Sequence, residues 1–115
     1  MPSKQFFTKR KETETSHKRA ASQRRAKKTR LLEQSYGMET GEYTRRLRQQ
    51  GYCCAICSTR HTVTKRLSID HDHTTGHVRG LLCPVCNSGL GMFRDDEDLL
   101  VKALRYLMTT RSVMP

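Results

Sequence analysis

The sequence has no long hydrophobic run. Its first residues, MPSKQFFTKRKE, are basic and lack the apolar core of about seven or more residues that a secretion signal requires. No stretch approaches the roughly 20 apolar residues of a membrane-spanning helix. We therefore expect a soluble, cytoplasmic protein with no membrane partner, in which disulfides are not the expected state of the cysteines.

Acidic residues are scarce in residues 1–30, which contain eleven Lys and Arg but only Glu12 and Glu14. This segment carries +9 of the net charge of +11, and it has almost no apolar residues between His17 and Arg30. Alone it should be disordered or a solvated helix. Because Lys and Arg release counterions when they neutralise phosphates, we predict a nucleic-acid-binding arm over residues 1–30. A solubilising tail or a contact with acidic protein is the alternative. The candidate phosphate contacts are Arg24, Arg25, Lys27, Lys28 and Arg30.

The remaining residues, 31–115, are predicted to form one small domain held by zinc. Four cysteines form two CxxC pairs, and their soft sulfur atoms suit tetrahedral zinc at about 2.3 Å. They are Cys54, Cys57, Cys83 and Cys86. Disulfides or free thiols are the alternative, and Cys53 is interpreted as a spare, partly buried thiol. A domain of this size is only marginally stable from apolar burial, and zinc binding can supply the deficit.

Local patterns predict helices on both sides of a two-stranded ribbon. One helix should run from Thr40 or Gly41 to about Gln50, with Tyr43 and Leu47 on its apolar side and Gly51 ending it. Between residues 62 and 82, β-forming residues flank the turn Thr74-Thr75-Gly76. The β-forming residues are Val63, Leu67, Ile69, Val78 and Leu82.

Two further helices are expected after the ribbon. Pro84 suits the first turn of a short helix that carries Cys86 and Asn87 and ends near Gly89 or Gly91. A last helix should cover residues 96–109, with Asp95 and Asp98 in a capping arrangement. Its apolar stripe is predicted mainly to cover the domain's own core, with a homodimer contact as the alternative. The stripe consists of Leu100, Ala103, Leu104 and Leu107.

Asp70-His71-Asp72-His73 is the candidate reactive centre. Strand alternation would place the aspartates on one face and the histidines on the other, until the turn twists them. The carboxylate of Asp70 and the amide oxygen of Asn87 are hard ligands of the kind that Mg²⁺ takes, and Mn²⁺ also fits such a site. The sequence thus predicts two kinds of metal site: zinc at the soft sulfur atoms, and a hard divalent cation at the oxygen atoms. Spacing alone assigns no catalytic role to these residues.

The segments CAIC, IDHDH, GHVRGLLCPVCN and GLGMF together resemble the recombination endonuclease VII family of HNH, or His-Me finger, nucleases. The resemblance covers residues 52–93 and, more weakly, the preceding helix YGMETGEYTRRLRQQ. It implies a small α+β fold, in which a zinc-stabilised ββα-metal nuclease module has flanking helices and the basic arm. It also implies a DNA endonuclease of a bacterial or phage-infected host cell.

The resemblance also implies roles for individual residues. Asp70 and Asn87 would bind Mg²⁺, His71 would be the general base that activates water, and His73 would lie near the scissile phosphate. Arg79 is interpreted either as a phosphate contact or as a solvated strand residue.

Other positions depart from the family pattern or fit it less clearly. Asp72 is interpreted either as the partner of a histidine or as a turn acceptor. The bacteriophage enzyme of this family has an acidic residue three positions after the asparagine, where this chain has Leu90, so that role is vacant or filled from elsewhere. Only 28 residues follow Asn87 here, whereas the phage enzyme continues into a long helical region that forms a dimer and recognises branched DNA.

Three functions remain open at this stage. The first is an endonuclease selective for branched DNA, such as a Holliday junction. The second is a less selective HNH enzyme of the nicking, homing, restriction or packaging kind. The third is a zinc-stabilised DNA-binding protein without catalysis, in which the DHDH run would be the charged tip of a structural zinc ribbon.

Overall fold

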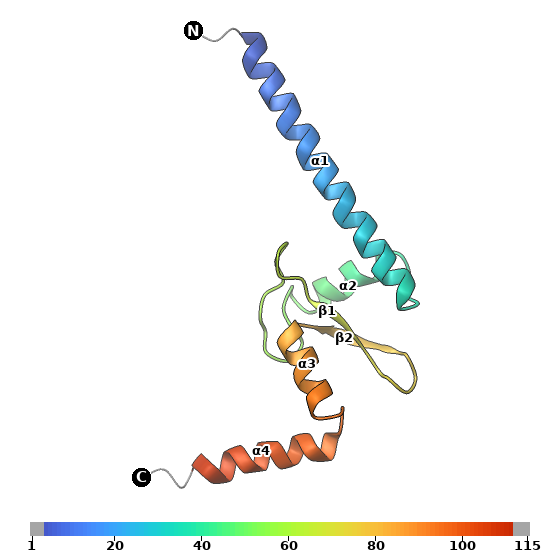
Figure 1. Ribbon diagram of the computed structural model, residues 1–115, viewed down its shortest axis with the longest axis vertical. Helices are drawn as coiled ribbons and strands as arrows, with labels where there is room; N and C mark the ends of the chain where they lie inside the picture. Colours follow the sequence, from blue (N-terminus) through green and yellow to red (C-terminus); the bar gives the residue numbers. More distant parts are fainter. Residues whose placement is uncertain (1–3, 112–115) are drawn as a thin grey trace. The chain divides into compact units, whose positions relative to one another are not determined.

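The computed structural model describes the backbone of residues 4–111 and the side chains of residues 15–111. Four helices and one two-stranded sheet make up this part of the chain (Figure 1). In chain order they are α1 (Lys4–Ser35), α2 (Glu42–Gln49), β1 (Ser68–His71), β2 (Val78–Leu82), α3 (Pro84–Met92) and α4 (Glu97–Arg111). The chain divides between Arg45 and Arg46 into two compact units. None of the described helices is long and apolar enough to cross a membrane.

Most of the basic segment is helical and belongs to the first unit. From Thr15 to Leu32 the helix α1 contains no acidic residue, and its basic side chains are exposed. Arg24, Lys27 and Lys28 follow i, i+3 and i+4 spacing, so they share one face of the helix. Glu33 is the only buried residue among the described side chains of α1.

The carboxylate of Glu33 anchors the start of α2. It is 2% exposed. One of its oxygens accepts the backbone N–H of Gly41 at 3.0 Å, and the other accepts that of Tyr43 at 3.3 Å. Amides in the first turn of a helix have no partner within the helix, and a negative charge there is favourable. Glu33 thus caps α2 from eight to ten residues upstream.

The end of α2 confirms the predicted stop at Gly51. The N–H of Gly51 donates to the carbonyl of Arg48 at 3.0 Å, and that of Tyr52 donates to Leu47 at 2.8 Å. This is a Schellman motif, and it requires a left-handed residue at Gly51, whose φ is 64°. After this turn the chain continues to the first cysteine pair, Cys54 and Cys57.

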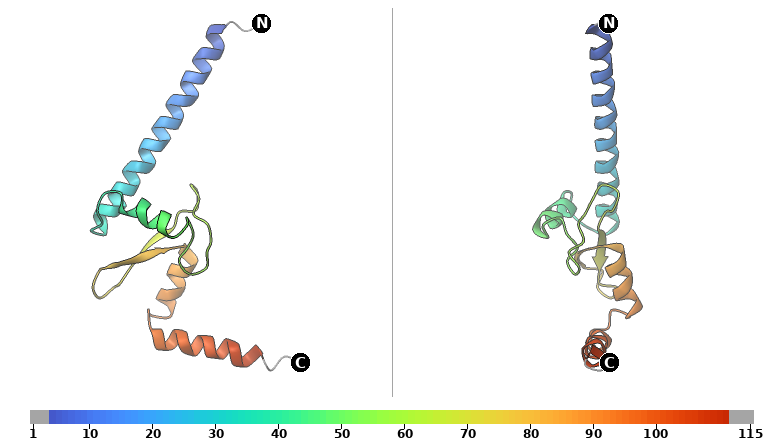
Figure 2. Two further views of the ribbon diagram at one scale, coloured as in Figure 1. Left: turned by 180° about the vertical axis from the view of Figure 1, so that it is seen from behind. Right: turned by 90° about the vertical axis from the view of Figure 1, so that its left-hand side faces the viewer.

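The hairpin of β1 and β2 is antiparallel and contains a β-bulge. Ile69 pairs with Leu81, Asp70 with Gly80, and His71 with Val78, so Arg79 is the extra residue on β2. The strands lie side by side, as the left view of Figure 2 shows. The turn through residues 74–76 confirms the prediction.

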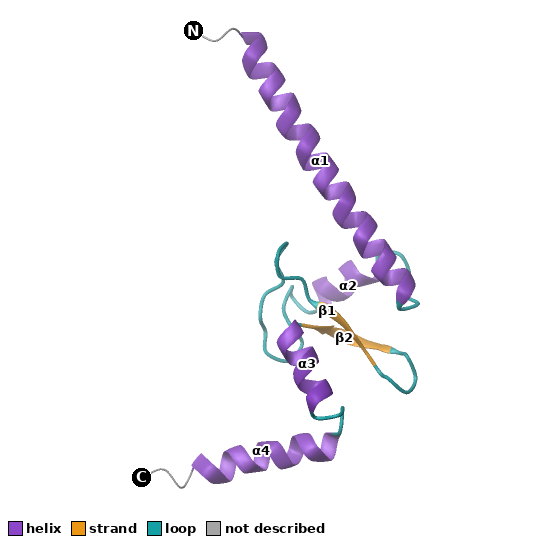
Figure 3. Cartoon of the chain, viewed as in Figure 1, coloured by secondary structure: helices purple, strands orange, loops and turns teal. Residues whose placement is uncertain are grey.

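The start of the ribbon was predicted too early. Val63 is 68% exposed and lies in the loop between α2 and β1, which contains no regular strand (Figure 3). The reason is a tight turn, in which the N–H of Thr62 donates to the carbonyl of Lys65 and the hydroxyl of Thr62 accepts the N–H of Lys65. These contacts replace strand pairing at Val63.

The core of the second unit lies between the sheet and the cysteine turns. Its buried apolar residues are Leu47, Cys54, Leu67, Ile69, Leu81, Leu82 and Cys83. Leu81 is fully enclosed, with 0% of its surface exposed. The side-chain amide of Gln50 pairs with both the N–H and the carbonyl of Leu81, each at 2.9 Å, and also donates to the carbonyl of Cys53 at 2.9 Å. Gln50 therefore joins the end of α2, the first cysteine turn and β2.

Helix α3 begins as predicted, with Pro84 at its first position and Cys83 as its cap. It runs to Met92, just past the expected end, and closes with a second Schellman motif. The N–H of Arg94 donates to Gly91 at 3.0 Å, and that of Asp95 donates to Leu90 at 2.9 Å.

Helix α4 corrects two predictions. Its cap is Asp96, whose carboxylate accepts the N–H groups of Asp98 and Leu99, whereas the expected cap, Asp95, is held in the preceding turn. The apolar stripe does not cover the core, because no residue of α4 is buried within the described chain. Leu104 is 56% exposed and Leu107 58% exposed. Periodicity shows that a helix has an apolar face but not which surface will cover it.

Candidate functional site

The four cysteines form the first part of the site. Their sulfur atoms all lie within 4.8 Å of one another. Sulfur atoms around zinc at about 2.3 Å are about 3.8 Å apart in a tetrahedron, so the spacing and the soft donors both fit zinc. The cluster consists of Cys54, Cys57, Cys83 and Cys86. Cys53 lies outside it, partly buried, and its thiol donates to the carbonyl of Gly51.

Local hydrogen bonds hold the sulfur atoms of the cysteine cluster and shift the pKa values of two of its thiols. The N–H of Cys86 donates to the sulfur of Cys83 at 3.4 Å. The hydroxyl of Thr59 lies 2.9 Å from the sulfur of Cys57, and this contact lowers the pKa of that thiol to about 6. The neighbouring sulfur of Cys83 raises the pKa of Cys86 to about 12. A metal ion would hold all four as thiolates.

The two histidines of the DHDH run lie together, as strand alternation predicts. Asp70 is buried, with 7% of its surface exposed. The rings of His71 and His73 are 4.8 Å apart and tilted by 55°, so both histidines lie on one side at the end of the hairpin.

Asp72 is a turn acceptor, one of its two predicted roles. Its carboxylate accepts the N–H groups of Thr74 at 2.7 Å and Thr75 at 3.1 Å. The backbone donors of Thr75 and Thr74 lower the pKa of Asp72, because they stabilise the ionised form. Its backbone N–H also pairs with the carbonyl of His77 at 2.8 Å, which extends the hairpin to the turn.

Arg79 binds two carboxylates. Its Nε donates to one oxygen of Asp70 at 2.8 Å, and its Nη2 donates to the other at 3.0 Å. The same Nη2 lies 3.3 Å from both oxygens of Asp95. The bond to Asp70, followed by that to Asp95, raises the pKa of Arg79 above its usual value, so the guanidinium is a permanent cation. Its predicted contact with phosphate remains a prediction.

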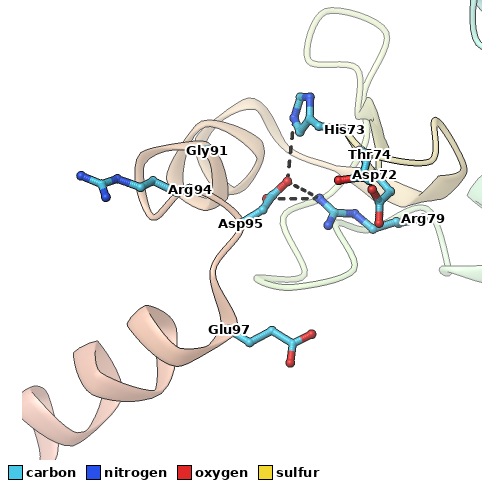
Figure 4. Close-up of a pocket in the computed structure, with 8 residues that line it drawn as sticks. All are labelled: Asp72, His73, Thr74, Arg79, Gly91, Arg94, Asp95 and Glu97. Carbon is cyan, nitrogen blue, oxygen red and sulfur yellow. Dashed lines mark hydrogen bonds and ion pairs between the residues drawn. The ribbon is translucent and has the colours of Figure 1, made fainter.

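A cavity of about 480 Å³ opens beside these groups. In Figure 4, Asp95 points toward both His73 and Arg79, whereas the side chain of Arg94 points away from them. The Nε2 atom of His73 lies 3.8 Å from Asp95. The other lining residues are Asp72, Thr74, Gly91 and Glu97.

Asn87 lies on α3, which contacts both strands. Its backbone N–H donates to the carbonyl of Cys83 at 3.0 Å, so it follows the second cysteine pair by one helical turn. Asp70 and Asn87 remain the predicted oxygen ligands, of the hard kind that suits Mg²⁺ or Mn²⁺.

The family model of recombination endonuclease VII matches residues 29–109. The chain belongs to the recombination endonuclease VII family. It is 44% identical over 86 residues to the Gene 59 protein of Mycobacterium phage L5, a match that covers 74% of this chain and 52% of the phage protein. It is 48% identical over 80 residues to the Gene 59 protein of Mycobacterium phage D29, covering 69% of this chain and 48% of that protein. The chain of this endonuclease VII family member thus spans about half the length of these curated relatives.

This endonuclease VII family member also resembles a solved structure. The β-β-α-Me type II restriction endonuclease Hpy99I is 39% identical to it, with 51% of this chain and 32% of that chain covered and a TM-score of 0.47.

Sequence reasoning did not identify Asp95 as part of the site. Asp95 was assigned to the cap of α4, and only the turn after α3 brings it to Arg79 and His73. The arm residues are far from this cluster in the sequence: Arg24, Arg25 and their neighbours belong to the first unit, where their side chains are exposed.

Proposed function

We propose that this protein is a metal-dependent DNA endonuclease that hydrolyses phosphodiester bonds at the closed end of the β1–β2 hairpin. One observation carries the proposal: in a member of the endonuclease VII family, Asp70 and His71 end β1, while Asn87 lies on the helix that contacts both strands. Membership of the endonuclease VII family supports metal-dependent nuclease activity, and the roles of the individual residues are proposed.

His71 is the proposed general base. Its partly exposed ring would take a proton from the attacking water. His73, whose side chain is 72% exposed and whose ring neighbours that of His71, would lie beside the scissile phosphate. Asp70 and Asn87 would hold Mg²⁺ or Mn²⁺. When bound, the ion would supply positive charge against the charge that develops on the phosphate and on the departing oxygen.

The test is nicking of supercoiled plasmid by zinc-loaded protein with added Mg²⁺. His71→Ala should bind DNA but lose cleavage, by about 10²-fold or more if His71 is the base. His77→Ala is the matched control, because His77 is an exposed histidine of the same hairpin and has no assigned role. Equal nicking by His71→Ala and wild type would remove His71 as the base. Absence of metal-dependent nicking by the wild type would instead favour a non-catalytic zinc-stabilised DNA-binding protein.

Selectivity for branched DNA is the finer proposal. It follows from the name of the family, and the alternative is a less selective HNH nicking, homing, restriction or packaging enzyme. Cleavage of a four-way junction should be compared with cleavage of linear duplexes that have the same arm sequences. A large preference for the junction supports resolution of branched DNA, and equal rates support the alternative.

The basic segment and the cellular setting complete the proposal. We assign residues 1–30 as a DNA-binding arm and residues 31–115 as the nuclease domain. Both curated relatives are phage proteins, which supports action on DNA in a phage-infected bacterial cell.

A further inference from the structure

A chain of polar contacts runs from the proposed metal ligand to the far side of the cavity. Arg79 holds both oxygens of Asp70 in a fork, with distances of 2.8 and 3.0 Å. Asp95 binds the same guanidinium at 3.3 Å and lies 3.8 Å from His73 (Figure 4). Asp95 therefore contacts both the partner of Asp70 and a proposed site histidine.

Arg79 holds the Asp70 carboxylate in one orientation but uses only part of its hydrogen-bonding capacity. A carboxylate has about four lone-pair positions, and a fork from arginine uses two of them. The plane of the Asp70 carboxylate is thereby set while the other positions remain available for a cation. Ligating carboxylates are commonly oriented by such hydrogen bonds from residues behind them.

The second carboxylate on Arg79 changes the net charge beside the proposed cation site. Asp70 and Arg79 alone are neutral together, and a neutral pair attracts a divalent cation poorly. Asp95 restores one negative charge to the group and shares Nη2 of the arginine, so Arg79 is held by both acids. The side chain of Asp95 is only 22% exposed, which limits screening by solvent.

The backbone at Arg94 and Asp95 adopts a left-handed conformation that residues other than glycine rarely adopt. Arg94 has φ 57° and Asp95 has φ 52°, two successive left-handed residues of which neither is glycine. The N–H of Asp95 is tied to the carbonyl of Leu90 at 2.9 Å. Strained residues persist where the surrounding contacts determine them, and they concentrate at functional sites.

We infer that Asp95 is a positioning residue of this site: acting through Arg79, it orients the Asp70 carboxylate for a divalent cation, and it restrains His73 at the edge of the same cavity. The inference rests on the proposed function for the role of Asp70. It assigns a task to a residue of the α3–α4 turn, outside the DHDH run and the asparagine.

The test compares Asp95→Asn with Asp96→Asn in zinc-loaded, full-length protein. Both variants remove one negative charge from the same turn. Asp96→Asn retains the cap of α4, because asparagine caps helices as well as aspartate does. Mn²⁺ binding to protein without DNA is measured from the signal of free Mn²⁺ in electron paramagnetic resonance, with Asp70→Asn as the variant that lacks the site. Plasmid nicking then gives kcat and KM.

Asp95→Asn should weaken Mn²⁺ binding and lower kcat, each by about 10- to 100-fold, as loss of a residue behind a metal ligand commonly does. The KM for DNA should not rise, because Asp95 is not assigned a contact with DNA and its loss removes a negative charge. Arg79→Lys should weaken Mn²⁺ binding similarly, since lysine cannot bridge both carboxylates with a fork, and its Mn²⁺ affinity provides the test if Asp95→Asn does not fold.

Equal Mn²⁺ affinity and kcat in Asp95→Asn and Asp96→Asn would overturn the inference. If the wild type cuts no DNA, the proposed function fails. Weaker Mn²⁺ binding in Asp95→Asn would still support the positioning role in that case, so the two failures are distinguishable.

Discussion

Replacing Gln50 should destabilise the second unit more than its partly exposed position suggests. Its side chain accepts the N–H of Leu81 and donates to the carbonyls of Leu81 and Cys53, all at 2.9 Å. Its amide thus pairs with the backbone N–H and carbonyl of Leu81 on β2, as a neighbouring strand would do. Gln50→Ala leaves the N–H of a fully enclosed residue without this partner, which costs about 1–3 kcal/mol.

The two carbonyl contacts add a smaller amount to this cost. The carbonyl of Leu81 retains the N–H of Ala55 at 3.2 Å, so only part of the usual 0.5–1.5 kcal/mol or so per hydrogen bond is lost there. We expect a total loss of about 2–4 kcal/mol. A unit of this size has about 4–10 kcal/mol of stability, so the variant should lose a large fraction of it.

Gln50→Glu distinguishes hydrogen bonding from simple packing. The glutamate keeps the shape and can still accept from Leu81, but it places a carboxylate oxygen against the carbonyls of Leu81 and Cys53. It should therefore be at least as destabilising as Gln50→Ala. Urea denaturation of zinc-loaded protein at fixed ionic strength measures both, with the exposed Gln49→Ala as the control. If Gln50→Glu were as stable as Gln49→Ala, the assigned contacts would not stabilise the fold.

Two further predictions concern the zinc cluster and the arm. Verified zinc removal by a strong chelator should unfold the second unit, measured as loss of far-ultraviolet circular dichroism and its recovery on adding zinc; an unchanged spectrum would contradict this. Changing Arg24, Arg25, Lys27, Lys28 and Arg30 to glutamine should weaken DNA binding and reduce the slope of log K against log salt, by about 4 to 5 if all five contact phosphates in duplex DNA. An unchanged slope would remove the arm from DNA binding.

The local features of the fold could be predicted because they depend on short sequence patterns. The two CxxC pairs predicted the sulfur cluster, and Gly51 and Pro84 marked the end of α2 and the start of α3. The turn at residues 74–76 was also identifiable. In each case the determining contact lies within a few residues of the signal, or uses a donor type with a strict geometric demand.

The features that could not be predicted depend on contacts between distant residues. From the sequence, Glu33 is an ordinary charged residue of a polar helix. In the structure it is buried, and its carboxylate accepts the N–H groups of Gly41 and Tyr43. Asp95 and Asp96 are identical in sequence terms, and only the left-handed turn after α3 assigns one to Arg79 and the other to the cap of α4. Pattern and composition contain no information about such choices.

The arrangement of the second unit implies a one-way dependence between its two metal sites. Cys83 starts α3, and Asn87 follows one turn later, while β2, which carries Arg79, ends directly before Cys83. Displacement of the sulfur cluster would therefore move both sides of the proposed catalytic site. We expect no dependence in the reverse direction, because among the described residues the side chain of Asp70 bonds to Arg79 and not to a cysteine. Zinc loss should thus abolish cleavage even with Mg²⁺ present, whereas Asp70→Asn should abolish cleavage and leave zinc content unchanged.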